Sequence, residues 1–397
     1  MTKCKTCGQE IKVEKTIQKI PAKTLIWGKI SDKKLTWDEA KEWCKQQGAG
    51  VRVASLFSGC GGGDLGLRGD FSFLGKYYPD LGFDLVWANE LEPIAAETYG
   101  KNVGKEIVVG DIIKIKSNEV PDHDLLVGGF PCQSFSMVGR RRGFNDPRGQ
   151  LYLEMVRILK AKKPAAFIAE NVKGLVSIHG GEALRIIKRD FEKVGYKVSY
   201  KVLNASHYGV PQKRERVFII GTRLDKSLPE FSFPEAPYTI VPLGKVIEPH
   251  ASVEKKYYFS ARALAGLRKA NKAFNKGRAQ FLDRPCNTVS THLAKVSLNG
   301  TDPVLLVTKN VYRRLTPREA ARVQSFPEDF EFSGTDGKKY IQIGNAIPPV
   351  LMWNVAKEVM SQIFNDGHIL KKETERDNVS HSVKKHSAGK GSVLIPA

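Results

Sequence analysis

The chain of 397 residues contains no apolar run that approaches the ~20 residues of a membrane-spanning helix. It also lacks a signal-peptide pattern, and its six cysteines are few and irregularly spaced, which does not indicate a disulfide framework. Acidic residues are scarce relative to basic ones. We therefore expect a cytoplasmic protein whose cysteines stay reduced.

The charge balance points to a polyanionic partner. Lys and Arg number 63 against 42 Asp and Glu, which gives a net charge of +21 and an isoelectric point near 9.6. Such an excess of positive charge suits nucleic acid. A hydrophobic content of 41% is ordinary for a globular chain that can bury a sizeable core, and the length indicates two or three domains.

The first 50 residues differ in composition from the rest and are predicted to be an N-terminal extension. Cys4 and Cys7 resemble half of a zinc knuckle, but no second pair follows at a suitable distance and Cys44 is isolated. We therefore expect no metal, although zinc binding remains the alternative. The segment Thr36–Gly48 has the pattern of a short capped helix.

A glycine-rich turn then follows an apolar run. Val51–Phe57 is typical of a buried strand and leads into Ser58–Gly66. Two further apolar runs end in the acids Glu90 and Asp111. Strands that end in turns and acids at one edge indicate an open α/β sheet that binds a nucleoside-bearing cofactor. The alternative is that both acids only cap the helices that follow them.

The segment Gly128–Ser136, GGFPCQSFS, places Cys132 after the apolar run Asp124–Val127. Glycines allow close approach of another molecule and Pro131 stiffens the turn. A lone cysteine is more often a buried structural residue, and the motifs further along the chain favour a reactive thiol here. The strand Ala165–Val172 carries the acid Glu170, which we expect at the same sheet edge.

A basic loop follows the cysteine. Val138–Phe144 contains Arg140, Arg141 and Arg142, and a loop in this place could close over a phosphate-bearing substrate. The alternative is a solvated surface. A helix is predicted to start near Leu151, where apolar residues recur at helical spacing.

Four motifs together resemble those of the DNA (cytosine-5)-methyltransferase family, of the bacterial or phage restriction–modification type. In chain order they are GGFPCQSFS, Ala169–Val172, Gln212–Arg216 and Gln342–Asn345. The resemblance implies an α/β fold: a Rossmann-like S-adenosylmethionine-dependent methyltransferase domain, with an open, mostly parallel sheet and helices on both faces. It also implies a smaller target recognition domain and a DNA-binding cleft between the two.

The same resemblance implies three sets of site residues. The catalytic set is Cys132, Glu170, Arg214 and Arg216. The set that binds S-adenosyl-L-methionine is Phe57, Ser58, Gly59, Cys60, Gly61, Gly62, Glu90, Leu91, Asp111, Ile112, Pro131, Leu151, Asn345 and Ala346. The DNA-binding set is Gln133, Ser136, Arg140, Arg141 and Arg142.

The chemistry of cytosine C5, which is a poor nucleophile, explains why the family that this chain resembles needs these residue types. A Cys132 thiolate that adds at C6 makes C5 reactive, and Glu170 holds a proton at N3. Arg216 is predicted to bind O2, with Arg214 beside it. The alternative for both arginines is a structural ion pair. The target base must be flipped out of the duplex to reach such groups.

The predicted division of the chain has four parts. Residues 1–50 form the extension, 51–224 with 340–366 the catalytic domain, 225–339 the recognition domain, and 367–397 a basic, disordered tail. Within the recognition domain, Thr316, Pro317 and Pro327 mark a helix. The predicted partner is double-stranded DNA with a short cytosine-bearing site, through which we expect association with the nucleoid. We expect the enzyme to be a monomer. A cognate restriction endonuclease would act independently of it.

Two other functions stay open. A cytosine-5 methyltransferase that acts on transfer RNA would share the motifs, but the insert between Gly221 and Tyr312 favours a DNA-reading domain. A non-catalytic DNA-binding protein would not need Cys132, Glu170 and Arg216 together with a cofactor turn.

Overall fold

The computed structural model describes most of the chain between residues 50 and 364. The described residues are 2–3, 10–11, 50–131, 151–226, 228, 230–269, 279–294, 302–308 and 311–364. The chain divides into two compact units, one made of 1–50 with 359–397 and the other of 51–358. The predicted helix at 36–48, the Cys4/Cys7 pair and the tail lie outside the described residues, and the predicted boundary at residue 225 stays a prediction.

The first unit contributes two short strands and one helical turn to the description. Strands β1 (Thr2–Lys3) and β2 (Glu10–Ile11) pair antiparallel. Met360–Phe364 forms a π-helical turn. All that follows concerns the second unit.

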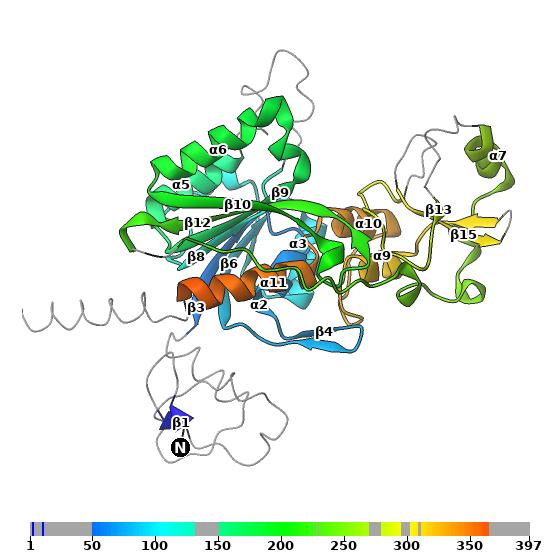
Figure 1. Ribbon diagram of the computed structural model, residues 1–397, viewed down its shortest axis with the longest axis horizontal. Helices are drawn as coiled ribbons and strands as arrows, with labels where there is room; N and C mark the ends of the chain where they lie inside the picture. The colour runs from blue at the N-terminus through cyan, green and yellow to red at the C-terminus, as the bar shows by residue number, and fades with distance from the viewer. Residues whose placement is uncertain are drawn as a thin grey trace, which may run out of the picture. The chain divides into compact units, whose positions relative to one another are not determined.

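A seven-stranded sheet is the centre of the second unit, in the order β10-β12-β9-β8-β3-β6-β7 (Figure 1). Its strands are β3 (Val51–Leu56), β6 (Phe83–Glu90), β7 (Ile107–Val109), β8 (Leu125–Gly128), β9 (Ala166–Val172), β10 (Tyr196–Asn204) and β12 (Glu215–Arg223). The five strands from β9 to β7 run parallel, whereas β12 is antiparallel to both β9 and β10. The predicted α/β fold with an open, mostly parallel sheet is confirmed.

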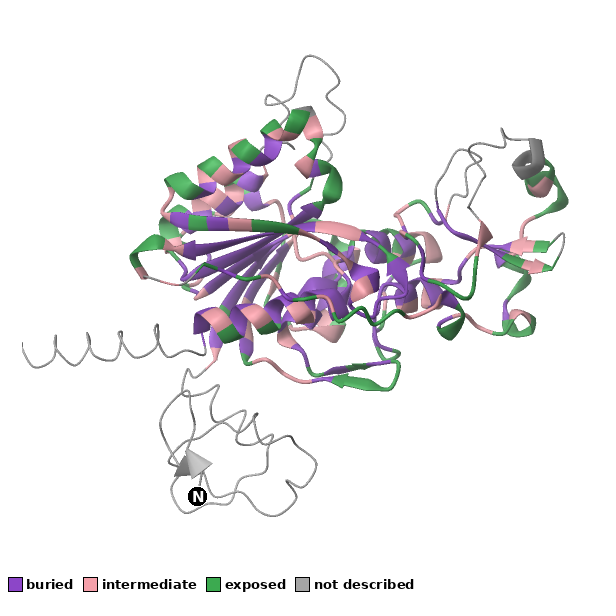
Figure 2. Cartoon of the chain, in the orientation of Figure 1, coloured by how far each residue is buried: buried purple, intermediate pink, exposed green. Residues whose placement is uncertain are grey.

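The inner strands are continuous apolar runs because both of their faces are covered. All four residues of β8 are buried, as are the first six of β9, and Figure 2 shows these strands in the buried colour. Phe167 needs a neighbour without a side chain, since a Cβ at Gly221 would lie 1.9 Å from its ring. The sheet therefore forms a closely packed core that fixes the strand ends.

Helices cover both faces of the sheet. Helices α5 (Tyr152–Lys162) and α6 (Glu182–Lys193) lie on one face, and α2 (Gly62–Arg68) and α11 (Pro349–Val359) on the other (Figure 1). A Cβ at Gly66 would lie 2.3 Å from the carbonyl oxygen of Pro349, so α2 and α11 pack backbone to backbone. The last helix of the unit, α11, thus packs against its first helix, α2.

The other helices and strands lie outside the seven-stranded sheet and the four helices named above. They are β4 (Phe71–Phe73), β5 (Lys76–Tyr78), α3 (Pro93–Asn102), β11 (Gln212–Lys213), α7 (Ala261–Lys269), β13 (Ala279–Gln280), β14 (Cys286–Asn287), β15 (Val304–Thr308), β16 (Val311–Arg313), α9 (Pro317–Val323) and α10 (Asp336–Asn345). The predicted cap of α9 is confirmed: the Thr316 side chain accepts a hydrogen bond from Glu319, and Glu319 accepts one from the Thr316 backbone.

Some elements differ from their predicted extents. Helix α11 ends at Val359, and Met360–Phe364 continues it as a π-helical turn. The apolar run that ends in Asp111 forms only the short strand β7, and a 3-10 turn, η2 (Ile112–Lys114), follows it. Strands β10 and β12 were not predicted.

Candidate active site

The glycine-rich turn after β3 has the backbone conformation that only glycine adopts easily. Gly59 and Gly61 have φ of 58° and 91°, and Phe57 also has a positive φ of 56°. A Cβ at Gly59 would meet nothing within 4 Å among the described residues, so space is open beside this backbone. The turn can therefore lie directly against a ligand.

Glu90 ends β6 beside this turn. Its carboxylate accepts hydrogen bonds from the backbone N–H of Gly59 at 2.8 Å and of Glu92 at 2.9 Å. Asp111 instead caps the 3-10 turn η2 by accepting a hydrogen bond from Ile113 N at 3.1 Å. The helix-cap alternative thus describes Asp111, whereas Glu90 is anchored to the glycine turn.

The other predicted cofactor residues differ in exposure. Ile112 is buried and Leu91 is 62% exposed. Phe57 and Leu151 are partly buried and pack on the same core cluster beneath the sheet edge. Pro131 is exposed. The predicted cofactor residues therefore include buried, partly buried and exposed side chains.

Arg157 holds the loop that contains Ile112. Its guanidinium donates to the carbonyl oxygens of Ile112 at 3.1 Å and Ile115 at 2.9 Å and to the hydroxyl of Ser117 at 2.8 Å, while Glu154 accepts two hydrogen bonds from it. The motifs did not identify this arginine. It fixes one wall of the candidate cofactor site from helix α5.

The C-terminal motif reaches the glycine turn from the far end of the chain. Asn345, the last residue of α10, is exposed, and Ala346 after it is buried. A Cβ at Gly62 would lie 2.9 Å from the carbonyl oxygen of Ile347 and 3.1 Å from the Ala346 side chain. The structure thus brings together two predicted cofactor segments that are almost 300 residues apart.

Cys60, in the same turn, is a packed thiol. It is 2% exposed, its Sγ lies 3.7 Å from the carbonyl oxygen of Gln342, and burial raises the pKa of Cys60 to about 12. Burial also raises the pKa of Cys286 to about 12. Neither is a thiolate at neutral pH, so neither competes with Cys132 as the candidate nucleophile.

Glu170 and Arg216 form an ion pair at the sheet edge. Arg216 Nε lies 3.1 Å from Glu170 Oε1, and the two side chains are 13% and 11% exposed. Strands β9 and β12 place them, because Arg216 pairs with Val172, two residues beyond Glu170. Burial raises the pKa of Glu170, while the charges of Arg216 and Arg214 act against this rise.

The turn that leads to Cys132 lies against this pair. A Cβ at Gly129 would be 3.7 Å from Glu170 Oε2. The carbonyl oxygen of Phe130 accepts a hydrogen bond from Asn171 Nδ2 at 2.9 Å, which fixes the turn to strand β9. Asn171 was not among the predicted site residues, although it follows Glu170 directly.

Arg214 has a different environment from Arg216. It is 2% exposed, and its guanidinium donates to the carbonyl oxygens of Val289, Gly344 and Ala346 at 2.8 to 3.1 Å. Burial lowers the pKa of Arg214 well below its usual range. The structure therefore separates the two predicted catalytic arginines: Arg216 contacts Glu170, and Arg214 binds backbone.

Several predicted residues lie outside the described part of the chain. They are Cys132, Gln133, Ser136, Arg140, Arg141 and Arg142. Within the described ranges, no three His, Cys, Asp or Glu side chains gather in a way that could hold a metal ion. No helix among the described residues is long and apolar enough to cross a membrane.

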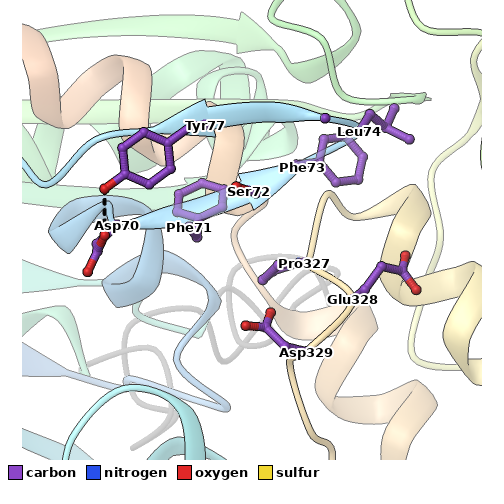
Figure 3. A pocket seen from close by; sticks show the side chains of 10 residues that line it. Asp70, Phe71, Ser72, Phe73, Leu74, Tyr77, Pro327, Glu328 and Asp329 are labelled. Atoms are coloured by element: carbon purple, nitrogen blue, oxygen red, sulfur yellow. Dashed lines mark hydrogen bonds between the residues drawn. The ribbon is translucent and has the colours of Figure 1, made fainter. Parts of the chain in front are cut away.

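A groove of about 500 Å³ lies between the β4–β5 hairpin and Pro327–Asp329 (Figure 3). Its rim carries the acids Asp70, Glu328 and Asp329, and none of the described site residues lines it. An acidic rim does not favour a phosphate backbone. We therefore place the candidate active site at the sheet edge and not in this groove.

An open α/β sheet with a glycine turn, an acid bonded to that turn and a buried acid–arginine pair at one edge defines a Rossmann-like α/β enzyme. The model of the family described as C-5 cytosine-specific DNA methylase matches residues 51–361. The chain belongs to this family and is a DNA cytosine-5 methyltransferase of the restriction–modification type.

Two relatives and one solved structure illustrate the similarity. Type II methyltransferase M.NgoFVII of Neisseria gonorrhoeae is 36% identical over 354 residues, which cover 80% of this chain and 88% of the relative. Type II methyltransferase M.FnuDI of Fusobacterium nucleatum is 35% identical over 364 residues, 81% of this chain and 98% of the relative. The crystal structure of S. pombe Dnmt2 methyltransferase shares the fold, with a TM-score of 0.62 at 21% identity over 78% of this chain and 98% of that one.

Proposed function

We propose that the enzyme transfers a methyl group from S-adenosyl-L-methionine to C5 of a flipped-out cytosine in double-stranded DNA, through a covalent bond between Cys132 and C6. The observation that carries this proposal is the buried Glu170–Arg216 pair, which lies against the turn that leads to Cys132. A thiol, an acid and a cation at one sheet edge are the groups that this chemistry needs.

The described residues fit the proposed cofactor. The open space beside Gly59 admits a ligand against the backbone, and the Glu90 carboxylate next to it is suited to ribose hydroxyls. Ile112, Leu151 and Asn345 would complete the site, with Arg157 holding the Ile112 loop from behind. When bound, S-adenosylmethionine supplies an electrophilic methyl group on its sulfonium.

Cys132 is the proposed nucleophile. Its thiolate adds at C6 of cytosine, and the electron pair of the C5–C6 double bond moves toward N3, so that C5 becomes nucleophilic. After C5 is methylated, loss of the C5 proton and release of the thiolate restore the aromatic ring. The two described thiols cannot take this role, since burial raises the pKa of Cys60 and of Cys286 to about 12.

Glu170 is the proposed acid at N3. Because burial raises the pKa of Glu170, the group can hold a proton closer to neutral pH than an exposed glutamate can. Arg216, 3.1 Å away, is placed to bind the cytosine O2 and to stabilise charge that develops on the ring. The charge of the same arginine limits the rise in the pKa of Glu170. The proton affinity of Glu170 therefore depends on its burial and on Arg216 together.

Arg214 is a positioning residue in this proposal. Its three carbonyl partners leave its guanidinium facing backbone rather than a ligand. We assign base reading to the region 225–339, as predicted, and phosphate contacts to the basic side chains there and in the 140–142 loop. The proposed setting is a restriction–modification system whose endonuclease acts independently.

The test uses the full chain with labelled S-adenosylmethionine and either double-stranded DNA or transfer RNA. Wild type should label DNA only, and Cys132→Ala should abolish labelling while DNA binding persists. DNA that carries 5-fluorocytosine should trap wild type covalently, because the proton to be lost is replaced. Labelling by Cys132→Ala at the wild-type rate, or labelling of transfer RNA alone, would refute the proposal.

A further inference from the structure

The groove along the β4–β5 hairpin lies apart from the sheet edge at which we place the active site. It has a volume of about 500 Å³ and lies between the hairpin and Pro327–Asp329 (Figure 3). Ligand sites commonly enclose about 300 to 1,000 Å³, so the groove is large enough for one. None of the described site residues lines it, and the proposed methyl transfer leaves it without a role.

The tip of the hairpin carries a leucine in a position that favours glycine or asparagine. Leu74 and Gly75 form the two-residue turn between β4 and β5, with φ of 48° and 75°. A turn with positive φ at both central residues favours Asn-Gly or Gly-Gly, and a leucine is strained in this conformation. The Leu74 side chain is also 49% exposed. Neither the turn geometry nor burial among the described residues therefore accounts for a leucine here.

Leu74 belongs to a larger apolar surface on the hairpin. Tyr77 is 54% exposed and lines the same groove. Phe71 and Phe73 line it from β4. An exposed apolar surface that is rimmed by polar side chains is typical of a site that binds another molecule.

The groove follows an open strand edge. Among the described residues, β4 pairs only with β5. In a two-residue hairpin the pair next to the turn, here Phe73 with Lys76, exchanges hydrogen bonds, and the following pair does not. Ser72 belongs to the following pair, so its N–H and C=O point to the open edge. Figure 3 shows β4 between β5 and Pro327–Asp329, so this edge faces the groove and can accept an extended chain as an additional strand.

The charge of the groove indicates what such a chain must carry. Among the described residues, its lining includes Asp70, Glu328 and Asp329 and no basic residue, although the whole chain has a net charge of +21. Glu328 is ion-paired with Arg322 at 2.7 Å, and Asp70 accepts a hydrogen bond from the Tyr77 hydroxyl at 2.6 Å. Asp329 is exposed at the rim. These acids repel a phosphate backbone and attract a Lys or Arg side chain.

We propose that the groove binds an extended segment of another protein in which a Lys or Arg stands beside a large apolar residue. The segment pairs with the open edge of β4 at Ser72. Its apolar side chain contacts Leu74 and Tyr77, and its cation contacts Asp329. Backbone pairing supplies affinity and the side-chain contacts supply selectivity. This docking site goes beyond the proposed function, because no step of methyl transfer requires it.

Subtractive selection from a random peptide library displayed on phage tests the proposal. The library is first depleted on a variant of the full chain that carries both Leu74→Asn and Asp329→Lys, which removes binders of every other surface. It is then selected on the wild-type chain. Peptides in which Lys or Arg stands beside a large apolar residue should be enriched. Failure to enrich any peptide, or enrichment of peptides without a basic residue, overturns the proposal.

A synthetic peptide from this selection then tests each contact through its dissociation constant. Ser72→Pro removes the outward N–H and keeps the hairpin bonds, so affinity should fall by about 10-fold or more. Leu74→Asn and Asp329→Lys should each weaken binding by about 10-fold. Leu224→Asn is the matched control and should keep wild-type affinity, because Leu224 is 59% exposed but lies outside the groove. Unchanged affinity in Ser72→Pro, or in both of the other groove variants, overturns the proposal.

Leu74→Asn also separates docking from folding. Because Asn-Gly is a favoured sequence for this turn, the variant should melt at the wild-type temperature or above it. It should methylate DNA at the wild-type rate, since Leu74 lies outside the candidate active site. Loss of peptide binding with both properties retained supports the docking site. A lower melting temperature would show that the leucine serves the fold and would overturn its assigned role.

Discussion

Replacing Asp64 by asparagine should make the protein more stable at neutral pH and should do so in a pH-dependent way. Asp64 lies in the first turn of α2, directly behind the glycine turn, and is 3% exposed. Its Oδ1 accepts a hydrogen bond from the Ser55 hydroxyl at 2.9 Å. Burial raises the pKa of Asp64 from 3.8 to about 6, against the opposing effects of Ser55, Tyr99 and Arg68.

The magnitude follows from this difference in pKa. The folded state holds the proton more tightly than the unfolded state, so the contribution of Asp64 to stability is fully present below pH 3.8 and declines as the pH rises to about 6. A pKa difference of this size corresponds to about 3 kcal/mol at 1.36 kcal/mol per pH unit. An asparagine side chain in this place would keep the acceptor for Ser55 and carry no charge, so Asp64→Asn should remove the decline.

The assay is urea unfolding of both proteins at several pH values between 4 and 8. The difference in free energy of unfolding between Asp64→Asn and wild type should be near zero at pH 4. It should rise to about 3 kcal/mol in favour of the variant at pH 7. The exposed Asp329→Asn is the control and should show no such trend. A difference that stays constant with pH, or a variant less stable than wild type at pH 7, would refute the reasoning.

Four further predictions concern the site. Glu170→Gln keeps the hydrogen-bonding shape without the proton, so kcat should fall by about 10²-fold with DNA binding retained, and single-turnover methylation will show this. Asn171→Ala removes the hydrogen bond that fixes the turn before the nucleophile. We expect kcat to drop by about 10-fold or more while the cofactor KM stays constant. An equal effect on kcat and KM would indicate a general structural role. Arg157→Lys cannot bind the two loop carbonyls together, so the cofactor KM should rise by about 10-fold with little change in kcat, and an unaltered KM would remove this arginine from the cofactor site. Exchange of residues 225–311 for the matching block of a relative should change the methylated sequence, as read by bisulfite sequencing; if the original sequence is still methylated, recognition lies elsewhere.

The sequence predicted the inner part of the sheet well, for a physical reason. Strands buried on both faces are largely apolar, and Glu90 at the end of β6 and Glu170 near the end of β9 lie at the sheet edge where ligands of such folds bind. The outer strand β10 was missed, since its exposed and buried residues alternate irregularly and include several lysine and tyrosine side chains.

The assignment of Arg214 and Arg216 to one catalytic set shows a limit of local sequence pattern, which does not report the contacts that a side chain makes with distant segments. The resemblance placed both arginines in the catalytic set because they stand together in the motif Gln212–Arg216. Arg214, however, precedes β12 in a tight turn in which its N–H donates to the carbonyl oxygen of Gln212 at 3.0 Å. Its partners Val289 and Gly344 come from 75 and 130 residues away, and no periodicity in the sequence reports contacts at that range.

The packing of α2 against α11 has a consequence for synthesis on the ribosome. The backbone of Gly66 meets Pro349, and that of Gly62 meets Ile347, so the glycine turn acquires its final neighbours only when the last sixth of the chain has emerged. A chain that ends before Ile347 can complete strands β3 to β12 and still lack these neighbours of the glycine turn.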